Sequence, residues 1–207
     1  MNPLTKYAAA ALISLIAGAA LALEAPDVVV KKAVEEVTAA INADQSIQNG
    51  NRQRINALVD QKVVPHLSLK TMTRAAAGPH WAKATLAQQQ ALTVEFKRLL
   101  TNTYSGAFTN YRPSTKIDYP PLRMAAGDTD AVVRSFVSVT GDRPIPVDYY
   151  MEVIDGDWKV VDLSVYGARM VETYKNQFTG AIASGGIDGL IKALGEKNNS
   201  IEGRKKS

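Results

Sequence analysis

The stretch from Ile145 to Phe178 constrains the fold more than any other part of the chain. In its first part apolar residues recur at every second position, the period of a β-strand with one buried face. Asp155-Gly156-Asp157 supplies a tight turn because glycine accepts positive φ, and a second strand returns from Trp158 to Val165. After Gly167, apolar residues recur at helical spacing. The stretch predicts a hairpin and an amphipathic helix around a shared interior, which is either a closed core or a pocket.

The chain before residue 111 predicts helices. Pro26 and Asp27 suit the start of a first helix, whose apolar face carries Val30, Val34, Val37 and Ile41. A second helix ends before a proline at residue 65, and a short segment follows up to the break at residues 78–79. Thr85-x-x-Gln88 is a capping box that opens the longest helix, which we expect to end near residue 104.

Short β-prone runs follow at residues 115–119, 122–125 and 131–139, separated by proline, glycine and aspartate. Short connections predict an antiparallel meander of about four strands, with helices packed on one face, in an α+β fold. After the helix that begins near Gly167, Ser184-Gly185-Gly186 predicts a hinge, and Gly195 predicts the end of a last short helix.

The first residues carry a targeting pattern. Lys6 precedes an apolar run, and Ala20-Leu21-Ala22 is a small-x-small cleavage site. The run is short for a membrane span, which needs about 20 apolar residues. We therefore expect a signal peptide at residues 1–22, one domain at 23–196 and a polar C-terminal tail at 197–207. An exported chain of this kind fits a bacterial periplasm.

Composition excludes several kinds of chemistry. The chain has no cysteine, so it can form neither a disulfide nor a zinc–thiolate site. Its two histidines, His66 and His80, have no carboxylate at ligand spacing, and we expect no metal site. Residues 51–98 carry eight bases and two acids, whereas residues 128–162 carry eight acids and three bases. Such polarity orients partners, but export and the lack of an aromatic–basic motif argue against nucleic acid.

Two uses of the apolar interior besides ligand binding remain open. Asp162 lies among apolar neighbours, close to Tyr149 or Tyr150 on the paired strand, which is the equipment of a proton-abstracting isomerase or dehydratase. An ordinary hydrogen bond or solvent contact of Asp162 is the alternative that we favour, and it implies no enzyme. A filled core would instead make the chain a structural adaptor. Apolar patterning alone does not separate a core from a cavity.

The chain resembles the MlaC or toluene-tolerance family of periplasmic phospholipid-binding proteins. The resemblance covers most of the chain after residue 22 and rests on the order and spacing of three blocks. These blocks are Gly78-x-x-Trp81 with Ala84-Thr85, Gln89, Phe96, Leu99-Leu100 and Tyr104; Trp158-x-Val160-x-Asp162 with Gly167 and Gln177-Phe178; and Gly186-Ile187-Asp188-Gly189-Leu190. The chain departs from the family at Gly167-Ala168-Arg169-Met170, where a hydroxyl residue is usual shortly after the glycine.

The resemblance implies a cone-shaped fold like that of nuclear transport factor 2, with an apolar cavity between sheet and helices. It implies phospholipid as cargo, no cofactor, and a carrier that maintains outer-membrane lipid asymmetry. The implied partners are an inner-membrane ABC transporter with an MCE-domain subunit and an outer-membrane lipoprotein–porin complex. Arg169 could meet a phosphate or a partner. The residues expected to line the cavity are Phe96, Leu100, Tyr104, Val147, Tyr149, Met151, Val161, Leu163, Ala168, Met170, Tyr174 and Phe178.

Overall fold

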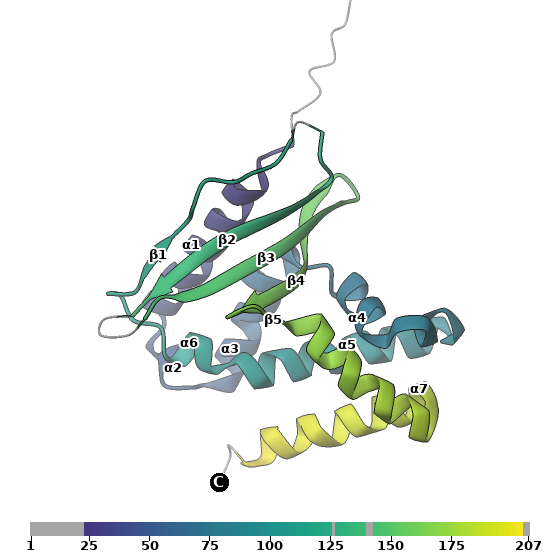
Figure 1. Cartoon of the computed structure of the whole chain (residues 1–207). Coiled ribbons are helices and arrows are strands. Elements are labelled where there is room, and N and C mark those ends of the chain that lie inside the picture. The colour runs from purple at the N-terminus through teal and green to yellow at the C-terminus, as the bar shows by residue number, and fades with distance from the viewer. Residues whose placement is uncertain (1–22, 126, 140–142, 205–207) are drawn as a thin grey trace, which may run out of the picture.

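The computed structural model describes residues 23–125, 127–139 and 143–204 (Figure 1). The expected signal peptide at residues 1–22 lies outside the described residues. The helical first half contains α1 (Pro26–Ala43), α2 (Gln45–Gln48), α3 (Arg52–Leu58), the π-helix η1 (Val59–Val63), the 3₁₀-helix η2 (Val64–His66), α4 (Leu69–Ala77), the 3₁₀-helix η3 (Gly78–Lys83), α5 (Leu86–Tyr104) and α6 (Gly106–Thr109). Of the helices in the described ranges, none is both long and apolar enough to span a membrane.

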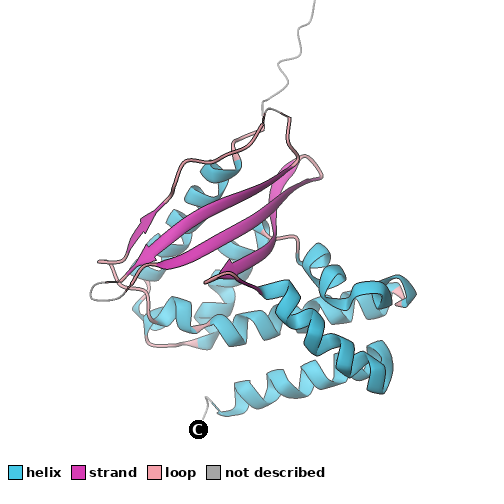
Figure 2. Cartoon of the chain, in the orientation of Figure 1, coloured by secondary structure: helices cyan, strands magenta, loops and turns pink. Residues whose placement is uncertain are grey.

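The sheet is an antiparallel meander in which each strand pairs with the next along the chain (Figure 2). Its strands are β1 (Lys116–Asp118), β2 (Asp130–Ser138), β3 (Ile145–Ile154), β4 (Asp157–Val165) and β5 (Ala168–Arg169). The expected α+β class is confirmed, with five strands instead of about four. The run at residues 122–125 forms no strand. It follows two prolines, which lack the N–H that a ladder needs.

Local chemistry fixes several element ends as expected. The Thr85 hydroxyl accepts a hydrogen bond from the Gln88 N–H at 3.2 Å, and the Gln88 side chain accepts one from the Thr85 N–H at 2.9 Å. Both bonds satisfy donors that α5 itself leaves unpaired. Asp155 and Gly156 both adopt positive φ in the turn between β3 and β4. Positive φ at both central residues matches the twist of a hairpin.

The helix α7 (Met170–Arg204) begins later and ends later than expected. A second positive-φ turn at Tyr166 and Gly167 first returns the chain along β4 as β5. Gly186 has φ 65° and ψ −167°, which confirms the predicted hinge, and the helix reverses direction there (Figure 1). Gly195 was wrongly expected to end the helix, which continues to residue 204.

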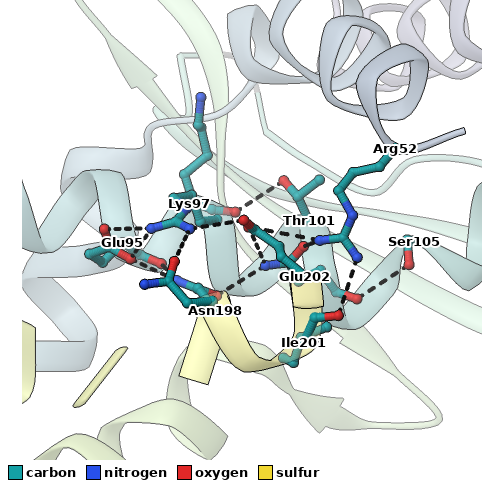
Figure 3. A network of polar contacts seen from close by, with 11 residues as sticks. Arg52, Glu95, Lys97, Thr101, Ser105, Asn198, Ile201 and Glu202 are labelled. Atoms are coloured by element: carbon teal, nitrogen blue, oxygen red, sulfur yellow. Dashed lines mark hydrogen bonds and ion pairs between the residues drawn. The ribbon is translucent and has the colours of Figure 1, made fainter. Parts of the chain in front are cut away.

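The polar tail was expected to begin at residue 197, but residues 197–204 belong to α7. Asn198 is fully buried, and its side-chain amide donates to the Glu95 backbone oxygen at 3.0 Å. Glu202 accepts from Asn102 at 3.1 Å and from Arg98 at 3.1 Å (Figure 3). Asn198 and Glu202 are therefore hydrogen-bonded to α5. Residues 205–207 lie outside the described ranges.

Buried side chains gather in three clusters instead of one continuous core. The first lies among α4, η3, α5 and α7 and contains Phe96 and Phe178. The second joins the start of α1 to the inner face of the sheet, which carries Met151. The third joins α1, α2, α3 and η1 around Ile41. Figure 1 shows α1 behind the sheet and the α4–α5–α7 layer beyond the edge formed by β4 and β5.

Candidate functional site

Two apolar pockets lie where the three clusters meet. The larger, here called the sheet pocket, has a volume of about 290 Å³ and lies between α1, η1, η2 and the inner face of the sheet. Its lining is almost entirely apolar and consists of Val29, Val30, Ala33, Val34, Val37, Lys62, Val63, His66, Leu67, Ala107, Phe108, Val147, Tyr149, Met151, Val160 and Leu163.

The smaller, here called the helix pocket, has a volume of about 150 Å³ and lies between η1, α4, α5 and the start of α7. It is lined by Val59, Val63, Val64, Leu67, Leu69, Met72, Lys97, Leu100, Thr101, Tyr104, Phe108, Leu163 and Met170. Four residues line both pockets: Val63, Leu67, Phe108 and Leu163. These four side chains form a shared wall, so the two pockets are neighbouring compartments of one apolar cavity.

A β-bulge decides which residues of β4 face the cavity. Tyr149 pairs with Leu163 and Met151 pairs with Val160, so Val161 is the extra residue between them. An extra residue shifts the side-chain alternation by one position. Strict alternation through β4 had placed Val161 on the cavity face. The structure places Val160 there instead, and Val161 lines neither pocket.

Seven of the twelve expected residues line the cavity. Val147, Tyr149 and Met151 line the sheet pocket, Leu163 lines both, and Leu100, Tyr104 and Met170 line the helix pocket. That these side chains contact lipid stays a prediction.

Three others, Phe96, Tyr174 and Phe178, form a closed aromatic cluster in the helical core. The ring centroid of Phe96 lies 5.1 Å from that of Tyr174 and 5.2 Å from that of Phe178, with edge-to-face geometry. Ala168 is exposed on β5. These three aromatic residues therefore stabilise the fold and do not line the cavity.

Of the elements that line the cavity, α1 supplies the largest single group of residues that were not predicted. Val29, Val30, Ala33, Val34 and Val37 form one wall of the sheet pocket. Their helical spacing was visible in the sequence and marked an apolar face. The spacing does not indicate that this face packs against the sheet. That contact is between α1 and strands that lie about 100 residues later in the chain.

The electrostatics of the cavity are those of an apolar medium. Burial raises the pKa of the Tyr149 phenol, and a hydrogen bond with Ser135 opposes this shift only in part. Burial also raises the pKa of Tyr104 to about 12, and the neighbouring Tyr174 adds to the rise. Desolvation disfavours the charged phenolate. Both phenols are therefore neutral near pH 7 and fit an apolar ligand.

Asp162 lies on the other face of the sheet and has structural partners. It is 2% exposed and accepts hydrogen bonds from the backbone N–H groups of Leu163 at 2.8 Å and Val171 at 2.9 Å. Arg169 Nε donates to its second oxygen at 2.8 Å, and the guanidinium lies 4.0 Å from the centre of the Tyr150 ring. Asp162 thus fastens β5 and the first turn of α7 to β4.

The described residues offer no cluster of three or more side chains suited to bind a metal ion. His66 lines the sheet pocket among valines, and His80 lies in η3. The donor groups that reach the cavity are thus few and dispersed. The arrangement can enclose an apolar group by burial alone.

An open antiparallel sheet, helices against its inner face and a divided apolar cavity between them define an α+β protein with an internal apolar binding cavity. The family model for the MlaC protein matches residues 31–196. This chain belongs to the MlaC family.

Several relatives have names that describe their own function. The intermembrane phospholipid transport system binding protein MlaC of Haemophilus influenzae is 23% identical over 183 residues, which are 87% of this chain and 85% of that one. Toluene tolerance protein ttg2D of Pseudomonas putida is 32% identical over 108 residues, about half of either chain (51% and 48%). A solved structure of a phospholipid-binding protein from Ralstonia solanacearum, in complex with a phospholipid, is 43% identical. It has a TM-score of 0.82 and covers 86% of this chain and 98% of that one.

Proposed function

We propose that this protein is a phospholipid carrier of the periplasm, which holds acyl chains in the sheet pocket and the helix pocket. The observation that carries the proposal is the divided apolar cavity, in a fold that matches a phospholipid complex at 43% identity. The volume of the sheet pocket, about 290 Å³, is near the lower end for ligand sites. Both compartments are therefore needed for a lipid.

The physical need for such a cavity follows from the cost of hydrating an acyl chain. Each methylene moved into water costs about 0.8 kcal/mol, so a sixteen-carbon chain costs on the order of 12 kcal/mol. A lipid crosses an aqueous compartment quickly only if its chains stay covered. Covering them requires no bond-making chemistry, and the partners of Asp162 support a structural role for that carboxylate.

The remaining parts of the proposal rest on the targeting pattern of the first residues and on family membership. Residues 1–22 act as a signal peptide that directs the chain to the periplasm. The carrier exchanges lipid with an inner-membrane ABC transporter that has an MCE-domain subunit and with an outer-membrane lipoprotein–porin complex. In this way it maintains the lipid asymmetry of the outer membrane.

Transfer between vesicles tests the carrier function. Donor vesicles contain a fluorescent phospholipid whose emission is quenched until the lipid reaches acceptor vesicles. We expect the mature chain to raise the transfer rate in proportion to its concentration, with no change in the chemical structure of the lipid. A rate equal to that of spontaneous transfer would refute the proposal, and a chemically altered lipid would revive an enzymatic function.

A further inference from the structure

A polar groove lies directly outside the helix pocket, between α3, η1 and α5. Its volume is about 200 Å³, and it is lined by Asn56, Val59, Asp60, Lys97, Arg98, Thr101, Asn102 and Glu202. Val59, Lys97 and Thr101 also line the helix pocket. At these three positions a single layer of side chains separates the apolar cavity from the groove.

The boundary between η1 and α5, here called the seam, lies beneath this groove and is bridged by polar contacts. Helix α5 packs mainly against α7 and α4, whereas η1 packs against α3, η2 and α1. Across the seam, Lys97 Nζ lies 2.6 Å from Asp60 Oδ1, and Arg52 Nη1 donates to Asn102 Oδ1 at 2.8 Å. Water can replace the exposed Lys97–Asp60 pair at little cost. The neighbouring η1 is a π-helix, a rare form that is frequent at functional sites.

Lys97 lines both the helix pocket and the polar groove. Its side chain lines the almost wholly apolar helix pocket, while its ammonium group pairs with Asp60 in the groove. A lysine can cover apolar surface with its methylene stem and keep its charge in water. A rotation of this one side chain would therefore uncover the helix pocket and free a cation at its rim.

The other cations in or beside the groove are held more firmly than Lys97. Arg98 is paired with Glu95 and with Glu202, and Arg52 contacts Asn102 and Glu202 (Figure 3). By contrast, the one ion pair that the described residues give Lys97 is with Asp60, which is 52% exposed. Of these three cations, Lys97 is thus the one that an incoming anion can capture most readily.

We propose that acyl chains enter and leave the cavity through this seam between η1 and α5, and that Lys97 controls it. In the closed seam Lys97 pairs with Asp60, and during passage it pairs instead with the lipid phosphate. A phosphate is the anionic part of the cargo and competes directly with a carboxylate for an ammonium group. This inference rests on the proposed carrier function and adds to it an access route and a phosphate contact.

Breaking the pair from its acidic side gives the first test. We expect Asp60→Asn to leave the amount of bound lipid unchanged and to speed exchange with vesicles by up to about five-fold, which is what an exposed ion pair contributes. Glu36→Gln is the matched control. Glu36 is also 52% exposed and pairs with Lys62 at 2.9 Å, but that pair joins α1 to η1 and does not cross the seam. Faster exchange in Glu36→Gln alone would place the route at the sheet pocket and overturn the inference.

Removing the cation separates a phosphate contact from a simple latch. Lys97→Met keeps an apolar side chain over the pocket and removes the charge. If Lys97 captures the phosphate, this variant loads lipid more slowly than Asp60→Asn. Equal loading rates for the two variants would overturn the phosphate contact.

A reversible cross-link across the seam tests the route itself. Because the chain has no cysteine, introduced cysteines are the only thiols that can react. Asp60→Cys and Lys97→Cys are combined and bridged with a short bifunctional thiol reagent that a reductant releases. We expect the bridged protein to retain its lipid and to exchange it at least ten-fold more slowly, with recovery after release. The control bridges Arg134→Cys and Asp148→Cys, which replace an ion pair on the outer face of the sheet. Exchange that continues in the bridged protein would overturn the route while leaving the carrier function intact. Absence of lipid from every variant would overturn both.

Discussion

Met151→Glu tests whether the sheet pocket holds an acyl chain. Met151 is 1% exposed and lines that pocket beside Tyr149 and Val160. When an acyl chain fills the pocket, no water reaches the introduced carboxylate, which must therefore be protonated to remain buried beside the chain. A carboxyl of ordinary pKa, about 4.3, lies three units below pH 7.3, and each unit costs about 1.4 kcal/mol. Protonation therefore costs about 4 kcal/mol, which weakens lipid binding about a thousand-fold.

The same reasoning fixes the pH dependence and the control. At pH 5 protonation costs only about 1 kcal/mol, so lipid retention recovers as the pH falls and is lost as it rises. Met151→Leu nearly conserves volume and should keep its lipid, because such swaps cost under about 1.5 kcal/mol. The assay is solvent extraction and mass spectrometry of lipid at several pH values, with circular dichroism to confirm folding. A folded Met151→Glu protein with wild-type lipid content at pH 7.3 would refute the placement of the chain.

Three further predictions concern the fold around the cavity. Asp162→Asn should lower the free energy of unfolding by about 1–3 kcal/mol, because the charge-assisted bond from Arg169 is lost. Lipid transfer should persist in this variant. Loss of transfer without a loss of stability would argue for a functional carboxylate. Phe178→Ala should lower the free energy of unfolding, measured by urea denaturation, by about 3–5 kcal/mol, since it removes a ring that is 1% exposed. The amount of lipid bound per folded molecule should not change, and a drop in that amount would place Phe178 in the cavity. Burial by itself raises the pKa of Glu202, but hydrogen bonds from Asn102 and Arg98 outweigh it and lower the pKa below 4.5. Its stabilising contribution is therefore present above pH 4.5 and is lost as the pH falls through the lowered value. Glu202→Gln should make stability less sensitive to acid in that range, and an unchanged pH profile would contradict this assignment.

Much of the fold could be predicted from local signals. The capping box at Thr85 and Gln88, the turn at Asp155 and Gly156 and the hinge at Gly186 each depend on neighbouring residues alone. The apolar residues that recur at helical spacing after Gly167 are buried on α7; they are Val171, Tyr174, Phe178 and Ile182. Local chemistry decides these features, so a single sequence suffices for them.

The remaining features depend on contacts between distant residues. Asn198 and Glu202 look like solvated tail residues, yet their partners lie on α5 about 100 residues earlier. The bulge at Val161 exchanges the faces of β4, and strict alternation gives no sign of it. The aromatic stripe of Phe96, Tyr174 and Phe178 looks the same in sequence whether it fills a core or lines a cavity. Only the three-dimensional arrangement shows that α1 and η1 form the cavity wall.

Native mass spectrometry of the mature protein, produced in bacteria and purified without detergent, tests the central claim most directly. We expect a mass that exceeds that of the polypeptide by one phospholipid or more, and solvent extraction should identify the lipid. Protein stripped of lipid should regain the added mass after incubation with phospholipid vesicles. A bare polypeptide mass before and after that incubation would contradict the carrier function.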